Sequence, residues 1–169
     1  RFLNFGSDSV KRYGYAASIE KLSYTDEQTE LVKQWLSRFD GISLREQAAA
    51  DFIHSITGYE TTRVLDPVFL LSQEQWMQIA EKRCFREPYI LCYQVQSAPC
   101  MQKIVNHLKK ITGYKTVAVL PYSVKWIKTD VALFDVSPEE FIYLISHAEI
   151  VVAASFHGAA LGIEFGKPV

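Results

Sequence analysis

The side chains best suited to chemistry lie in a segment near the end of the chain, residues 150–162, with the sequence IVVAASFHGAALG. An apolar run followed by small residues predicts a strand that turns into a helix. In α/β proteins ligands bind beyond the carboxyl ends of strands, and the first turn of a helix adds unpaired backbone amides and a positive dipole. This turn is therefore a candidate anion-binding site.

Three residues of the turn have types that suit an anionic ligand. Ser155 is a natural helix cap, and Gly158 permits a close approach of the backbone. His157 can donate a hydrogen bond to a phosphate or carboxylate, or exchange a proton near neutral pH. The alternative for His157 is an imidazole packed against the sheet. Its position at a strand-to-helix turn favours a functional role.

Arg45 has the same kind of position earlier in the chain, at the predicted carboxyl end of a strand and just before a helix that opens at Glu46. A guanidinium there can hold a carboxylate or phosphate through two parallel hydrogen bonds. The alternative is a solvent-facing ion pair with Glu46 or Asp51, which would contribute little to stability. The spacing alone does not choose between these two interpretations.

Other chemistries have less support in the sequence. The remaining three histidines lie on predicted helices without a second ligand three or four positions away, so no metal site is expected. No dinucleotide, P-loop or GxSxG motif is present. The cysteines at positions 84, 92 and 100 lack the spacing of a zinc site or a disulfide framework, and we expect reduced, mostly buried thiols.

The composition of the 169 residues is that of a soluble globular protein, with 49% hydrophobic residues and a formal net charge of -1. That charge provides no excess of Lys and Arg for nucleic acid, so a small ligand is expected instead. No run approaches the roughly 18 apolar residues of a membrane span, and no leader pattern is found. We therefore expect a cytoplasmic protein without an integral membrane segment. The chain opens on Arg1 and stops where an apolar strand begins, which predicts truncation at both ends.

Helices and strands are predicted to alternate along the chain. Apolar residues recur at helical spacing over residues 25–39, 46–57, 72–80, 101–112 and 137–148, and three of these helices open with a capping box. Short apolar runs predict strands at 41–44, 62–65, 89–95, 116–120 and 149–154. This alternation predicts an α/β fold with Rossmann-like parallel sheets and helices on both faces. We place a domain boundary after residue 66, giving parts of an N-terminal domain (1–66) and a C-terminal domain (67–169).

Two passages echo each other. Residues 56–65 (ITGYETTRVL) and 111–120 (ITGYKTVAVL) are identical at seven of ten positions. Each combines the predicted end of a helix, a glycine and the start of a strand. The same local geometry is expected in both, with the glycine in the left-handed conformation that ends many helices.

Three stretches of the chain, in this order and spacing, resemble the polysaccharide pyruvyl transferase family. They are residues 39–46 (FDGISLRE), residues 64–71 (VLDPVFLL), and residues 137–148 (SPEEFIYLISHA) with the following 155–158 (SFHG) and 166–168 (GKP). The last stretch is the most specific, and the resemblance extends over nearly the whole chain.

The resemblance implies two facing Rossmann-like domains of the GT-B type with an active site between them. It also implies transfer of a pyruvyl group from phosphoenolpyruvate to sugar hydroxyls of a cell-surface polysaccharide or its precursor. The residues themselves indicate no metal and no tightly held cofactor. The positions that would inherit the donor contacts are Arg45 and His157, and Ser155 and Gly158 would complete the substrate-binding turn. Peripheral association with a lipid-linked glycan is compatible with such an activity.

The chain departs from the family at one site position. Many members have an arginine two residues before the histidine, and Ser155 stands there. Ser155 keeps open a nucleotide- or sugar-phosphate-binding domain without catalytic activity. The other alternative is a GT-B glycosyltransferase that binds the diphosphate of a nucleotide sugar near His157.

Overall fold

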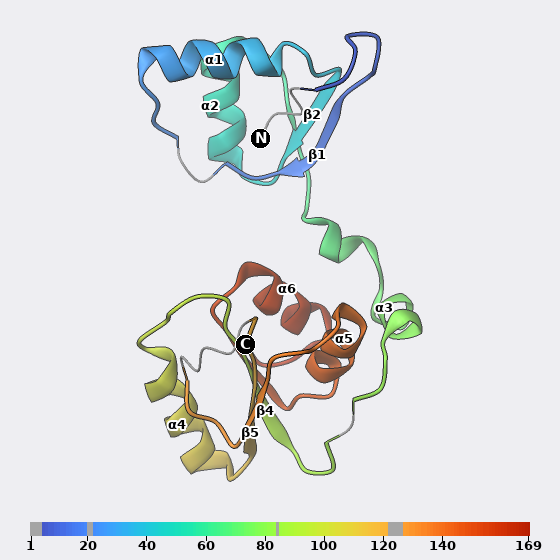
Figure 1. Cartoon of the computed structure of the whole chain (residues 1–169), viewed down its shortest axis with the longest axis vertical. Helices are drawn as coiled ribbons and strands as arrows, with labels where there is room; N and C mark the ends of the chain where they lie inside the picture. Colours follow the sequence, from blue (N-terminus) through green and yellow to red (C-terminus); the bar gives the residue numbers. More distant parts are fainter. Residues whose placement is uncertain (1–4, 20–21, 84, 122–126) are drawn as a thin grey trace. The chain divides into compact units, whose positions relative to one another are not determined.

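The computed structural model describes residues 5–19, 22–83, 85–121 and 127–169, and it divides the chain into two compact units, Arg1–Pro67 and Val68–Val169. Each unit has its own sheet, and every paired strand in both sheets is parallel to its neighbour (Figure 1). The predicted α/β class with parallel sheets is confirmed.

The first unit is a three-stranded sheet in the order β1-β2-β3 with two helices. Its elements are β1 (Tyr13–Ala17), α1 (Asp26–Leu36), β2 (Gly41–Leu44), α2 (Gln47–Thr57) and β3 (Thr62–Arg63). Leu44, at the end of the central strand β2, is buried in one cluster with apolar residues of α1 and α2. This packing fixes the carboxyl end of β2 against both helices.

The second unit is a four-stranded sheet in the order β6-β5-β4-β7. Its elements are the 3₁₀ helix η1 (Pro67–Leu70), α3 (Gln73–Ile79), β4 (Tyr89–Tyr93), α4 (Met101–Thr112), β5 (Lys115–Val119), β6 (Val131–Leu133), α5 (Pro138–Ser146), β7 (Ile150–Ala153) and α6 (Phe156–Glu164). The sequence patterns did not predict β1 or β6, and β3 is shorter than the predicted 62–65.

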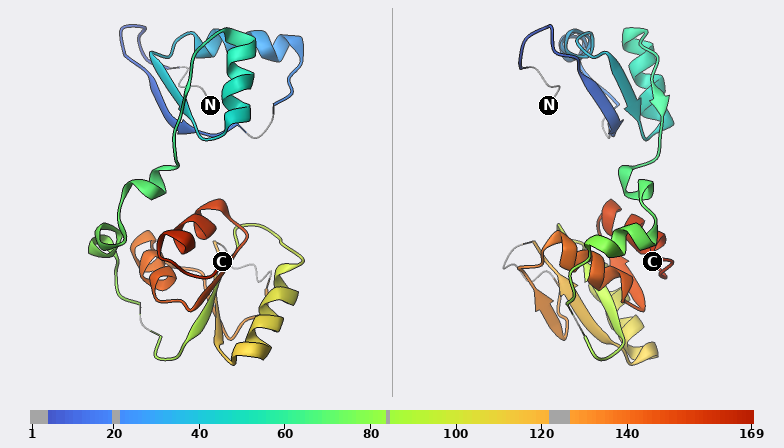
Figure 2. Two further views of the ribbon diagram at one scale, coloured as in Figure 1. Left: turned by 180° about the vertical axis from the view of Figure 1, so that it is seen from behind. Right: turned by 90° about the vertical axis from the view of Figure 1, so that its right-hand side faces the viewer.

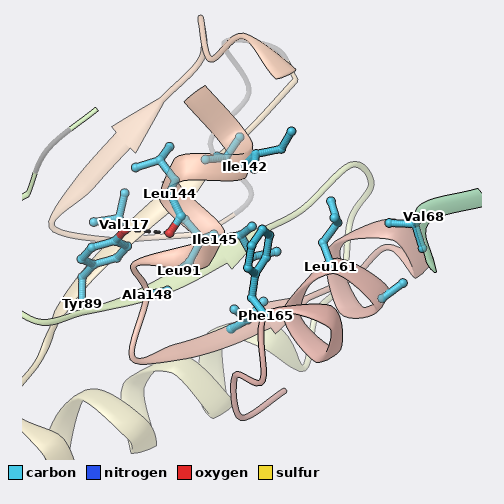
Figure 3. Packing of buried hydrophobic residues seen from close by; sticks show 13 residues of the cluster. Val68, Tyr89, Leu91, Val117, Ile142, Leu144, Ile145, Ala148, Leu161 and Phe165 are labelled. Carbon is cyan, nitrogen blue, oxygen red and sulfur yellow. Dashed lines mark hydrogen bonds between the residues drawn. The ribbon is translucent and has the colours of Figure 1, made fainter. Parts of the chain in front are cut away.

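Helices cover both faces of this second sheet (Figure 2). Side chains alternate along β4, so that Leu91 faces a cluster with α5 and α6 while Cys92 faces a cluster with α4. Figure 3 shows the first cluster, in which the Tyr89 hydroxyl also donates a 2.6 Å hydrogen bond to the Leu144 carbonyl. β4 is therefore buried on both of its faces.

Helix ends follow the sequence signals closely. The capping boxes predicted for α1, α3 and α5 are all present, each with both reciprocal hydrogen bonds. The two echoed passages adopt the same geometry: Gly58 and Gly113 have φ of 67° and 72°, in the left-handed region. In each, the threonine before the glycine donates to the carbonyl one turn earlier and accepts from the following tyrosine amide.

Candidate functional site

The strand order of the second unit places a topological switch between β4 and β7. From β4 the chain runs outward through β5 to β6 and then returns to the other side of β4 to form β7. Ligands of open α/β sheets bind beyond the carboxyl ends of strands at such a point. The turn from β7 into α6, with Ser155 and His157, lies at this edge, because Ala153 is the register partner of Tyr93 at the end of β4.

Ser155 stands at the N-cap position of α6, as predicted, but its side chain forms no capping hydrogen bond. The expectation that its hydroxyl caps the helix is therefore wrong. The reason is local geometry: Ser155 has φ -145° and ψ 139°, whereas the three serine and threonine caps that do form hydrogen bonds have φ near -70° and ψ near 160°. Ser155 is half-buried, and its hydroxyl consequently does not cap the backbone amides of α6.

His157 is exposed, on the first turn of α6. Its ring lies edge-on to the exposed Phe156 ring, with centroids 5.3 Å apart and an interplanar angle of 84°. The alternative of an imidazole packed against the sheet does not match this placement. An exposed imidazole at the positive end of a helix dipole is suited to contact an anion in solution.

Gly158 is buried, and its lack of a side chain is required by the packing of α6 on the sheet. A Cβ atom at this position would lie 2.5 Å from Tyr93 Cδ1 and 3.0 Å from Ala153 Cβ. Both contacts are closer than ordinary van der Waals packing allows. Gly158 thus lets the start of α6 lie against the ends of β4 and β7, and it sets the position of His157 next to it.

Gln94 is a polar residue at the same sheet edge that the sequence patterns did not single out. It directly follows β4, it is 1% exposed, and its backbone amide donates to the Val119 carbonyl at 3.3 Å. Within the described part of the chain its side-chain Oε1 atom is buried without a hydrogen-bond partner. The sequence shows Gln94 as a single polar residue within the apolar run 89–95.

Arg45 lies at the carboxyl end of β2, the central strand of the first unit, as predicted. Its backbone amide donates to the Ala17 carbonyl at 3.0 Å. Its guanidinium Nη1 forms an ion pair with Asp66, and Nε lies 3.9 Å from the Glu46 carboxylate. The principal partner is therefore Asp66, rather than Glu46 or Asp51.

The structure brings Ser155, His157 and Gly158 together at one turn of the second unit and places Arg45 in the first unit. Both locations are carboxyl ends of parallel strands followed by a helix, as the sequence predicted.

Other reactive groups in the described residues offer little chemistry. Burial raises the pKa of the Cys92 thiol on β4 to about 12, which makes it a poor nucleophile. Cys100 is exposed, contrary to the expectation of mostly buried thiols, and Cys84 lies outside the described residues. No group of three or more His, Cys, Asp or Glu side chains in the described ranges is arranged to hold a metal ion. None of the described helices has the length and apolar character needed to cross a membrane.

The chain matches the model of the family described as polysaccharide pyruvyl transferase over residues 2–169. The matched region includes Arg45, Asp66 and the whole turn from Ser155 to Gly158. A search of curated proteins found no match.

Proposed function

The chain belongs to the polysaccharide pyruvyl transferase family, and on that premise we propose that it transfers a pyruvyl group from phosphoenolpyruvate to sugar hydroxyls of a cell-surface polysaccharide or its precursor. Arg45 and His157 are the proposed catalytic residues, and Ser155 and Gly158 belong to the proposed donor-binding turn. The observation that carries the proposal is that the family match spans both strand ends at which these residues stand.

The chemistry of the donor explains why these residue types are needed. Phosphoenolpyruvate carries a carboxylate and a phosphate, and a tight site for two anions requires cations and correctly aimed hydrogen-bond donors. Arg45 offers a planar guanidinium for one anionic group. The start of α6 offers its dipole, the Ser155 hydroxyl and the exposed His157 imidazole for the other.

The transfer consists of an addition at C2 of phosphoenolpyruvate followed by a substitution at the same carbon. In the first, C3 gains a proton and one sugar hydroxyl oxygen bonds to C2 as its own proton is lost. In the second, the bond from C2 to the phosphate oxygen breaks, phosphate leaves with a proton, and another acceptor hydroxyl bonds to C2 and loses its proton. The product is a ketal, and no electrons pass to an external acceptor, so the reaction requires no redox cofactor.

In this scheme His157 acts on the phosphate. It either donates a proton to the departing phosphate or holds it as a neutral hydrogen-bond donor. Arg45 orients the donor so that C2 faces the acceptor.

The experiment measures phosphate release from phosphoenolpyruvate with an acceptor glycan, for the wild-type protein and for His157→Ala. We expect kcat to fall on the order of a hundredfold or more, the usual contribution of general acid–base catalysis. His107→Ala is the matched control, because His107 is an exposed histidine on α4 of the same unit. Near-normal turnover of His157→Ala would remove this residue from the mechanism.

Calorimetry with phosphoenolpyruvate and with nucleotide sugars tests the donor itself. Binding of phosphoenolpyruvate followed by phosphate release supports the proposed reaction. Binding of a nucleotide sugar in its place would indicate a glycosyltransferase. Binding of a sugar phosphate without turnover would indicate a non-catalytic binding domain.

A further inference from the structure

The ion pair between Arg45 and Asp66 joins two parts of the first unit that are separated by 21 positions in sequence. Arg45 directly follows the central strand β2, and Asp66 comes shortly after the short strand β3. The Asp66 side chain is 6% exposed, and the Arg45 side chain is 23% exposed. The carboxylate is therefore nearly enclosed, whereas the Arg45 side chain as a whole remains partly exposed, although its Nε atom is buried.

The backbone holds Asp66 beside Arg45. β3 pairs with β2 so that Arg63 is the register partner of Leu44, and the Val64 amide donates to the Leu44 carbonyl at 2.9 Å. Pro67 then restricts Asp66 to extended conformations and opens the 3₁₀ helix η1. These constraints bring the chain past the end of β2 and turn it away directly after Asp66.

The pair is more than a surface contact. A buried carboxylate is costly unless a cation or hydrogen-bond donors satisfy it, so the ion pair favours a guanidinium held beside Asp66. The consequence for Arg45 is the loss of rotamer freedom before any ligand arrives. Such preorganisation increases affinity because the binding step no longer bears the entropy cost of ordering a long side chain.

We propose that Asp66 is a positioning residue that orients the Arg45 guanidinium for the phosphoenolpyruvate donor, an inference that rests on the proposed function. Asp66 has two effects of opposite sign on donor affinity. Its negative charge reduces the attraction of Arg45 for an anion, and its hydrogen bond aims the guanidinium. The inference is that the second effect is the larger.

Asp66→Asn separates the two effects, because it removes the charge and nearly preserves the shape of the side chain. If orientation dominates, the dissociation constant for phosphoenolpyruvate rises about tenfold or more. If charge dominates, donor binding becomes tighter. In calorimetry a misfolded fraction lowers the binding stoichiometry and leaves the dissociation constant unchanged, so this measurement distinguishes positioning from a merely structural role. Asp66→Glu retains the carboxylate and is expected to recover part of the affinity.

A double-mutant cycle tests whether Asp66 acts through Arg45. Asp66→Asn is expected to cause no further loss of donor affinity when Arg45 is already alanine, because the group it orients is gone. Glu140→Gln is the matched control in the second unit. It neutralises the partner of Arg83, at 2.9 Å, and glutamine can still complete the capping box of α5, so wild-type donor affinity is expected.

The outcomes separate this inference from the proposed function. If wild-type protein binds phosphoenolpyruvate and Asp66→Asn binds it equally well or more tightly, the positioning role is overturned and the proposed function stands. The positioning role is also overturned if the losses of donor affinity caused by Asp66→Asn and by Arg45→Ala add up in the double variant. If the wild-type protein does not bind phosphoenolpyruvate, the proposed function and this inference are both overturned.

Discussion

Gly158 has the tightest steric requirement among the proposed site residues. A methyl group added there would approach the Tyr93 ring to 2.5 Å and the Ala153 side chain to 3.0 Å. The Ala153 Cβ cannot withdraw without moving the end of β7, and the Tyr93 ring packs against the Phe141 ring, with centroids 4.5 Å apart. The helix start must move instead, and it carries His157.

We therefore expect Gly158→Ala to lower both stability and activity. Overpacking of this kind costs about 1–3 kcal/mol of unfolding free energy, and displacement of His157 should lower kcat in the folded protein. Urea unfolding and phosphate release measure the two effects. Gly14→Ala is the control, since its added Cβ would meet only the Phe39 and Ile42 side chains at 3.5 Å or more, which is ordinary contact. Equal stability of both variants and the wild type would contradict the packing argument.

At the residue scale, the sequence predicted where the site residues stand in the fold better than it predicted which side chains they contact. The placement of Arg45 and of the Ser155–His157 turn at strand ends follows from local patterns, and the structure agrees with it. The partner of Arg45 was missed because Asp66 comes beside it only through the pairing of β2 with β3. The side-chain Oε1 atom of Gln94, which has no hydrogen-bond partner among the described residues, was missed as well. Its burial depends on the fold, and a single polar residue in an apolar run does not reveal it.

At the scale of elements, strong local signals were reliable and weak ones were not. The three capping boxes and the two left-handed glycines have short-range causes, and all are present. β1 escaped prediction because its side chains are mostly exposed and give no apolar run. β6 has only three half-buried residues, so its existence depends on pairing with β5 rather than on its own composition.

The start of β5 depends on one carboxylate outside the strand. Asp130 Oδ2 accepts hydrogen bonds from the Thr116 amide and hydroxyl, both at 2.9 Å, and Oδ1 pairs with the Lys109 ammonium of α4. The hydrogen bond from Lys109, followed by that from the Thr116 amide, lowers the pKa of Asp130 from 3.8 to about 2. The charged form of Asp130 therefore stabilises the fold.

This shift predicts an acid-dependent loss of stability. Because the pKa is lower in the folded state than in the unfolded state, the contribution is complete above about pH 4 and disappears as the pH falls through about 2. With screening at a side chain that is 33% exposed, we expect a loss of about 1–2 kcal/mol over this interval. Urea unfolding between pH 2 and pH 6 measures it.

Two variants identify the source of that loss. Asp130→Asn should be less stable than wild type at neutral pH and should show a weaker dependence on pH below 4. Asp135→Asn removes a carboxylate that is 85% exposed and serves as the control for the change in net charge. A wild-type pH dependence in Asp130→Asn would assign the effect to other carboxylates.

At the scale of the whole molecule, the cores divide as the units do. Every buried residue of the two clusters around the second sheet lies between Val68 and Phe165, and every buried residue of the remaining cluster lies between Val32 and Ile53. In the described residues, no cluster takes buried members from both units. The hydrophobic free energy of each sheet is therefore supplied by its own unit.

From this division we predict that residues 68–169 fold without the first unit. In the described residues the unit has a four-stranded parallel sheet with helices on both faces, and its length lies within the usual range of independent domains. The isolated segment should unfold cooperatively in urea and give dispersed amide resonances in a nuclear magnetic resonance spectrum. Tyr89 and Leu144 belong to one buried cluster of this unit, and the Tyr89 hydroxyl donates to the Leu144 carbonyl. Tyr89→Phe should therefore lower the unfolding free energy of the isolated segment by about 1 kcal/mol. A non-cooperative transition with collapsed amide dispersion would show that the second sheet requires the first unit for its stability, in contradiction to the separation of the cores.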